Sequence, residues 1–176
     1  MKKIYPLPII GLMFFVLAQG AITSAHQISN LEAQQQHGNS NEFDFSALHV
    51  GDTVAGMKVV SIQPAIESLP LSKDNFQVQF QGKAIISGKY HYQDTAAFGP
   101  YLWVDQLTPG SEEKLPKLRG EGSTSFCFSN MDDAQQIFGP VGSEGKTKVQ
   151  ISDYTYVHAS AEVCNTAKLV SVLSKN

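Results

Sequence analysis

The feature that most constrains the fold of this chain is a strict alternation of apolar and polar residues near its middle. Phe76, Val78 and Phe80 alternate with three glutamines. Successive side chains of a β-strand point to opposite faces, so this period of two predicts a strand with one buried face. The alternation resumes after Gly82, which predicts either a hairpin that turns there or one long strand with bulges at Gly82 and Gly88.

Other segments follow the same period. The sequence predicts two short strands within 50–62, a strand over 99–107, another over 123–129, and two closing strands over 148–158 and 161–173. In the strand over 99–107, Leu102 and Val104 point one way, and the alternate residues point the other way. A mainly β fold follows from these patterns.

One segment has helical spacing instead. Ala134, Ile137 and Phe138 recur three to four residues apart, which places them on one face of a helix. Asn130 is a suitable N-cap, the aspartates that follow suit the positive end of the helix dipole, and Gly139 with the next proline ends the helix. The sequence therefore predicts one short helix in an otherwise β-rich chain.

The N-terminus has the pattern of a cleavable export signal. Lys2 and Lys3 precede an apolar run from Ile9 to Ala18, and small residues lead to a cleavage point after Ala25. The alternative is an uncleaved anchor, but the run is about half of the roughly 20 residues that a membrane-spanning helix needs. We expect residues 1–25 to be removed and the protein to be exported, periplasmic or extracellular, without stable membrane insertion.

Composition sets the domain boundaries. Residues 26–42 are polar and cannot bury enough surface to offset chain entropy, so they are predicted to be a disordered linker. Residues 43–176 have the size of a single β-rich domain, which we expect to be a monomer.

Charge excludes one class of partner. Without Lys2 and Lys3 the chain has 11 basic residues against 16 acidic ones, a net charge of −5. Affinity for nucleic acid comes mainly from positive charge facing phosphates. Nucleic acid and anionic membrane surfaces are therefore not expected as partners.

The chain has two cysteines, Cys127 and Cys164. Exported proteins usually fold in an oxidising compartment, so the sequence predicts a disulfide between them. The alternative is two buried free thiols. Neither cysteine has a close Cys or His partner at ligand spacing, and we expect no metal and no cofactor.

The order of elements from Phe76 to Leu173 resembles the OB-fold, a five-stranded Greek-key barrel with a helix between its third and fourth strands. The helix over 131–138 directly follows the third strand. The closing pair over 149–154 and 167–172 is similar to the last hairpin of bacterial tRNA-anti-like OB domains. The resemblance implies a small OB-like five-stranded barrel with one short helix and an N-terminal β extension. An immunoglobulin-like sandwich is the alternative, and the helix disfavours it.

The resemblance also indicates a binding face. OB domains bind oligonucleotides, oligosaccharides and proteins on their second and third strands and nearby loops. Tyr101, Trp103 and Asp105 would lie on that face, bordered by the loop Thr108–Gly122. Tyr101 and Trp103 are a candidate platform for a sugar ring or a partner protein. Alternatively, they cover a second small core with the N-terminal strands.

The histidines are the weaker site candidates. His91 with Asp94, and His158 with Asp153 and Glu162, have the residue types of a metal or acid–base site. Their spacing matches no ligand pattern, which favours surface histidines. The chain also has no nucleophile elbow and no phosphate-binding glycine loop, so we expect no enzyme.

These observations predict a non-catalytic exported binding module for a protein, a peptide or an envelope glycan. One alternative is a periplasmic inhibitor or immunity-type protein that inserts the loop Thr108–Gly122 into its partner. The other is a metal-dependent hydrolase that uses His91 or His158.

Overall fold

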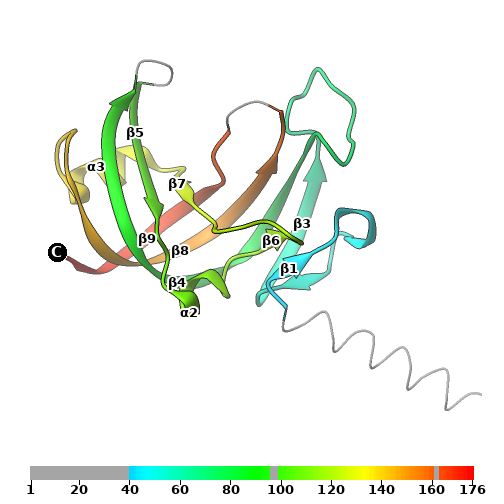
Figure 1. Cartoon of the computed structure of the whole chain (residues 1–176), viewed down its shortest axis with the longest axis horizontal. Helices are drawn as coiled ribbons and strands as arrows, with labels where there is room; N and C mark the ends of the chain where they lie inside the picture. Colours follow the sequence, from blue (N-terminus) through cyan, green and yellow to red (C-terminus); the bar gives the residue numbers. More distant parts are fainter. Residues whose placement is uncertain (1–39, 96–98, 161–162) are drawn as a thin grey trace, which may run out of the picture. The chain divides into compact units, whose positions relative to one another are not determined.

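The computed structural model describes residues 40–95, 99–160 and 163–176. The predicted export signal, and all of the predicted linker before Ser40, lie outside the described residues. The domain is mainly β, as predicted (Figure 1). Its strands are β1 (Glu42–Phe43), β2 (Thr53–Val54), β3 (Met57–Gln63), β4 (Phe76–Thr95), β5 (Gly99–Asp105), β6 (Lys117–Leu118), β7 (Phe126–Phe128), β8 (Glu144–His158) and β9 (Thr166–Lys175). The helical segments are η1 (Phe45–Ala47), α2 (Pro109–Glu112) and α3 (Met131–Phe138).

None of the described helices is long and apolar enough to cross a membrane.

Strand β4 is one long, curved strand, so the predicted hairpin at Gly82 is wrong and the long strand is the correct alternative (Figure 1). Its first part pairs with β3 and its last part with β5, both antiparallel, while β8 pairs along the opposite edge. The register with β8 shifts between Phe80 and Lys83, which places Gly82 at a bulge. Gly88 lies in regular register with Thr147, so no bulge forms there.

The strand pairings form a closed cycle. From β4 they run to β5, then to β7, β9 and β8, and return from β8 to β4. The pair β7–β9 is parallel, whereas the other pairs in the cycle are antiparallel. The predicted N-terminal strands, β2 and β3, extend the sheet beyond β4, and β1 pairs with β6 in a separate two-stranded sheet.

Aromatic rings fill the core at both ends of β4. Near its start, Phe43 of β1 packs edge-on against Tyr156 with 5.2 Å between ring centroids, and Phe45 of η1 stacks on Phe76. Near its end, Phe138 of α3 packs on Tyr90 at 4.7 Å. A buried aromatic side chain removes about 150–250 Å² from water, so segments outside the strand cycle contribute substantially to the core.

Helix α3 forms where the sequence predicts it. Ala134 and Phe138 are buried, whereas Ile137 is 42% exposed and lies outside the core. Asn130 occupies the N-cap position, but its side chain makes no cap bond to the helix backbone. Instead its amide donates to Leu169 O and accepts from Leu169 N, which ties the start of the helix to β9.

The segment Thr108–Gly122, which the sequence predicts to be a loop, has regular structure and a buried anchor. It contains α2 and β6, and the Leu115 side chain is fully buried. The Ser111 hydroxyl, also buried, accepts a hydrogen bond from Ser87 N of β4. Asn41, at the end of the predicted linker, donates its side-chain amide to Glu112 O at 3.0 Å. The segment is therefore bound to β4 through Ser111 and to the residues before β1 through Asn41.

Gly88 provides a test of the β4–β5 contact. A Cβ atom at this position would lie 2.6 Å from Asp105 O and 2.8 Å from Leu107 Cδ2. We expect Gly88→Ala to lower the free energy of unfolding by about 1–3 kcal/mol, the usual cost of overpacking. Denaturant unfolding monitored by circular dichroism measures it. Gly122→Ala is the control, because nothing lies within 4 Å of its Cβ; equal effects at the two positions would contradict the close packing.

Candidate functional site

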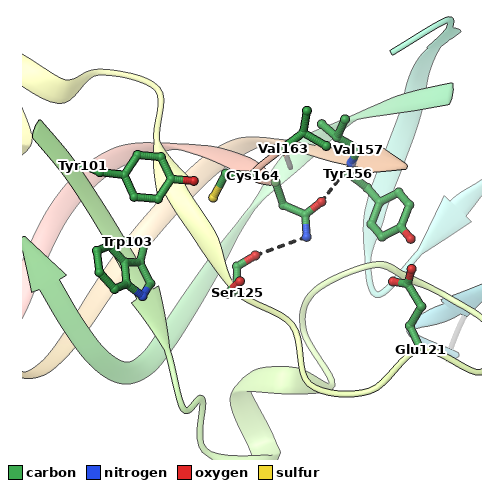
Figure 2. Close-up of a pocket in the computed structure, with 9 residues that line it drawn as sticks. Tyr101, Trp103, Glu121, Ser125, Tyr156, Val157, Val163 and Cys164 are labelled. Carbon is green, nitrogen blue, oxygen red and sulfur yellow. Dashed lines mark hydrogen bonds between the residues drawn. The ribbon is translucent and has the colours of Figure 1, made fainter. Parts of the chain in front are cut away.

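A pocket of about 330 Å³ lies beside β5 and the segment that precedes β9 (Figure 2). In Figure 2, Tyr101 and Trp103 form one side, and Tyr156 and Glu121 lie at the other. Two of the three predicted ligand-binding residues thus line the pocket, and the third, Asp105, is not among its lining residues. The lining residues are Tyr101, Trp103, Glu121, Ser125, Tyr156, Val157, Val163, Cys164 and Asn165.

Buried and outward-facing side chains alternate along β5, and the outward-facing aromatic residues form one side of the pocket. Leu102 and Val104 are fully buried, so Tyr101 and Trp103 lie on the outward face and are half-buried. Their rings are 5.6 Å apart between centroids and tilted by 43°, which makes a wall rather than an enclosure. The ring contacts of Trp103 within the described residues are with Tyr101 and His91.

A disulfide fixes the neighbouring side of the pocket. Cys127 and Cys164 are bonded, as predicted. Cys127 on β7 is the register partner of Trp103, so the disulfide attaches the segment before β9 next to the aromatic wall. Asn165 reinforces this attachment, since its side chain accepts from Val157 N at 2.8 Å and donates to Ser125 O at 3.2 Å. Asn165 was not predicted as a site residue, because its only signal in the sequence is its position next to Cys164.

Two buried tyrosine hydroxyls lie near the other side of the pocket. Tyr154 and Tyr156 are at most 1% exposed. Burial raises the pKa of both phenols, and Glu121 raises it further, at Tyr156 through a hydrogen bond as well as through its charge. Figure 2 shows the Tyr156 hydroxyl directed toward Glu121. The Tyr156 hydroxyl is therefore buried beside the Glu121 carboxylate, which is the charged group that lines the pocket on this side.

His158 has different partners from those predicted. Its ring stacks on Phe76 at 5.2 Å, and its Nδ1 lies 3.5 Å from Oε1 of Glu121. The predicted partner Asp153 instead accepts a hydrogen bond from the Ser152 hydroxyl. The other predicted partner, Glu162, lies outside the described residues. His158 therefore lies within ion-pair distance of Glu121, the carboxylate that lines the pocket.

His91 forms a second cluster behind the aromatic wall. It is 9% exposed, and its ring stacks on Trp103 with 5.0 Å between centroids and 16° between planes. Its Nε2 lies 3.1 Å from Oδ1 of Asp105, and its Nδ1 lies 3.3 Å from Oε2 of Glu144. The predicted partner Asp94 is exposed and takes no part. The second Asp105 oxygen accepts from the indole Nε1 of Trp103 at 3.1 Å.

The histidine clusters do not form a metal centre in the part of the chain that the structure describes. There, no group of three or more His, Cys, Asp or Glu side chains could hold a metal ion. Comparisons with protein-family models, curated proteins and solved structures find no match for this chain. The pocket is therefore interpreted from its own chemistry.

The disulfide gives a quantitative prediction. It closes a loop of 37 residues, for which chain entropy corresponds to about 3–4 kcal/mol of stabilisation. We expect a variant with both cysteines changed to serine to lose about that much in denaturant unfolding. Wild-type protein unfolded with a reductant should show a similar loss, and the double variant should not respond to the reductant. Equal stability of the oxidised wild type and the variant would contradict this prediction.

Proposed function

We propose that the domain is an OB-type barrel and that the protein is a non-catalytic exported binding module. The strand cycle supports the fold. Taking β4, β5, β7, β8 and β9 as strands one to five, the pairing order is one, two, three, five, four and back to one. Strands three and five are parallel, and α3 lies between strands three and four, an arrangement that resembles the OB-fold.

The position of the pocket is the observation that carries the binding proposal. OB domains bind ligands on strands two and three, next to the loops between strands one and two and between strands four and five. In this assignment Tyr101 and Trp103 belong to strand two. Cys164 and Asn165 belong to the connection between strands four and five. This position supports binding at the face that OB domains use.

The chemistry of the pocket favours a glycan as the ligand. Glu121 is the one charged side chain among the described lining residues, so an anionic group is disfavoured there. The wall of Tyr101 and Trp103 offers an apolar surface to the C–H face of a sugar ring. On the other side, the Glu121 carboxylate accepts hydrogen bonds, which suits the hydroxyl groups of a sugar. We propose a neutral envelope glycan.

The disulfide supports export, whereas the two alternative functions have less support than the binding module. The Cys127–Cys164 disulfide is compatible with an oxidising compartment outside the cytoplasm. The inhibitor hypothesis has less support, because Leu115 of its inserting loop is buried in the domain. The hydrolase hypothesis also has less support, because His91 and His158 each pair with carboxylates rather than with a metal-binding set.

Binding to a panel of neutral oligosaccharides, followed by calorimetry on the best ligand, tests the proposal. We expect Trp103→Ala to weaken binding at least about tenfold, as for a central aromatic contact.

Val141→Ala is the matched control, because Val141 is exposed and is not among the pocket residues. It should bind as the wild type does. Unchanged affinity in Trp103→Ala would show that the pocket is not the site. A peptide library that selects Trp103-dependent peptides, with no oligosaccharide binding, would show that the ligand class is wrong.

A further inference from the structure

His91 is enclosed by groups that its register brings together. In the β4–β5 ladder its partner is Trp103, and in the β4–β8 ladder its partner is Glu144. The remaining contact is Asp105, two residues after Trp103 on β5. Both ring nitrogens therefore face a carboxylate oxygen within 3.3 Å, although the ring is 9% exposed.

This geometry favours an imidazole that carries a proton on both nitrogens. A neutral imidazole carries one N–H donor and one acceptor nitrogen, so one carboxylate would face a lone pair. The imidazolium donates from both nitrogens, and each bond is then charge-assisted. Lys89, and to a smaller extent His91, lower the pKa of Glu144, which keeps this carboxylate ionised. The two carboxylates offset the cost of burying a charged ring.

We propose that His91 is a positioning residue whose proton holds Trp103 in the pocket wall. Two contacts transmit the effect to Trp103. The charged ring stacks on the indole as a cation–π pair. The ring also anchors Asp105, whose other oxygen accepts from the Trp103 indole N–H. Loss of the proton removes the cation and one of the two carboxylate bonds, so the indole becomes less restrained.

The charged groups around His91 define the sign of the pH dependence. Asp105 reaches it from β5, Glu144 from β8, and Lys89 of its own strand binds the same Glu144 oxygen at 3.0 Å. The restraint on Trp103 is strongest while the imidazole is charged and weakens when the ring loses its proton at higher pH. At acidic pH it weakens again when the carboxylates are protonated. The consequence of this restraint for ligand affinity rests on the proposed function. The restraint itself can be tested without a ligand.

Nuclear magnetic resonance of the wild-type protein gives the direct test. Nitrogen-15 shifts of the imidazoles are followed between about pH 4 and 9, a range that covers ordinary carboxyl and imidazole titration. We expect both His91 nitrogens to be protonated at mildly acidic pH. We also expect the indole N–H signal of Trp103 to move with the same midpoint as His91. A His91 ring with one proton throughout, or an indole signal that does not follow it, would overturn the proposal.

Quenching of tryptophan fluorescence by acrylamide gives a second test, because Trp103 is the only tryptophan. In the wild type, quenching should increase as the pH rises through the His91 titration. In His91→Gln, which cannot carry the proton, this step should be lost. His49→Gln is the control, since His49 is exposed and its Nδ1 lies 3.9 Å from Asp52, away from the cluster; it should keep the step.

The outcomes separate the two proposals. A step that persists unchanged in His91→Gln overturns the role of His91, whatever the protein binds. Failure to find a glycan, with a normal step in the wild type, counts against the proposed function alone. The wild-type resonance experiment remains decisive if His91→Gln does not fold.

Discussion

Strand β4 is the element on which the rest of the domain depends, because it pairs with three other strands. One edge serves β3 and then β5, while the other serves β8. The bulge near Gly82 inserts an extra residue relative to β8, which increases twist and bends the strand. Asp153 of β8 adopts a left-handed φ of 50° opposite this region. Beyond the bend, Gly88 lets the end of β5 approach closely. The positions of Trp103 and Asp105 therefore depend on a glycine of the neighbouring strand.

The elements with strong local patterns could be predicted from the sequence. The alternation around Phe76 and within β5 identified the buried faces, and helix α3 appeared at its predicted place. The pairing of Cys127 and Cys164 followed from their number and the expected compartment. In each case, the prediction needed only the pattern of nearby residues or the number of cysteines. The segment around Leu115 carried no such period, because Leu115 and Leu118 stand among charged residues without a repeated spacing that would indicate burial.

The partners of the histidines could not be predicted from proximity in sequence. Asp94 lies three residues after His91, and on a strand an odd separation places two side chains on opposite faces. The period-two argument therefore excludes Asp94 once β4 is known to continue. The real partners, Asp105 and Glu144, come from the two neighbouring strands. Asp105 was recognised as outward-facing beside Trp103, but its role required the β4–β5 register. Long-range register was the missing information.

The two sides of the pocket are supported by different kinds of interaction, and this difference bears on how the site can respond to its surroundings. The Cys164 side is held by a covalent bond and by the neutral hydrogen bonds of Asn165. Neither changes with protonation between mildly acidic and neutral pH. The Trp103 side is held by a stacked imidazole and a shared carboxylate. Proton dependence of the aromatic wall therefore enters through His91 of β4 and its contact with Asp105, while the disulfide side stays fixed and provides the reference against which Trp103 is positioned.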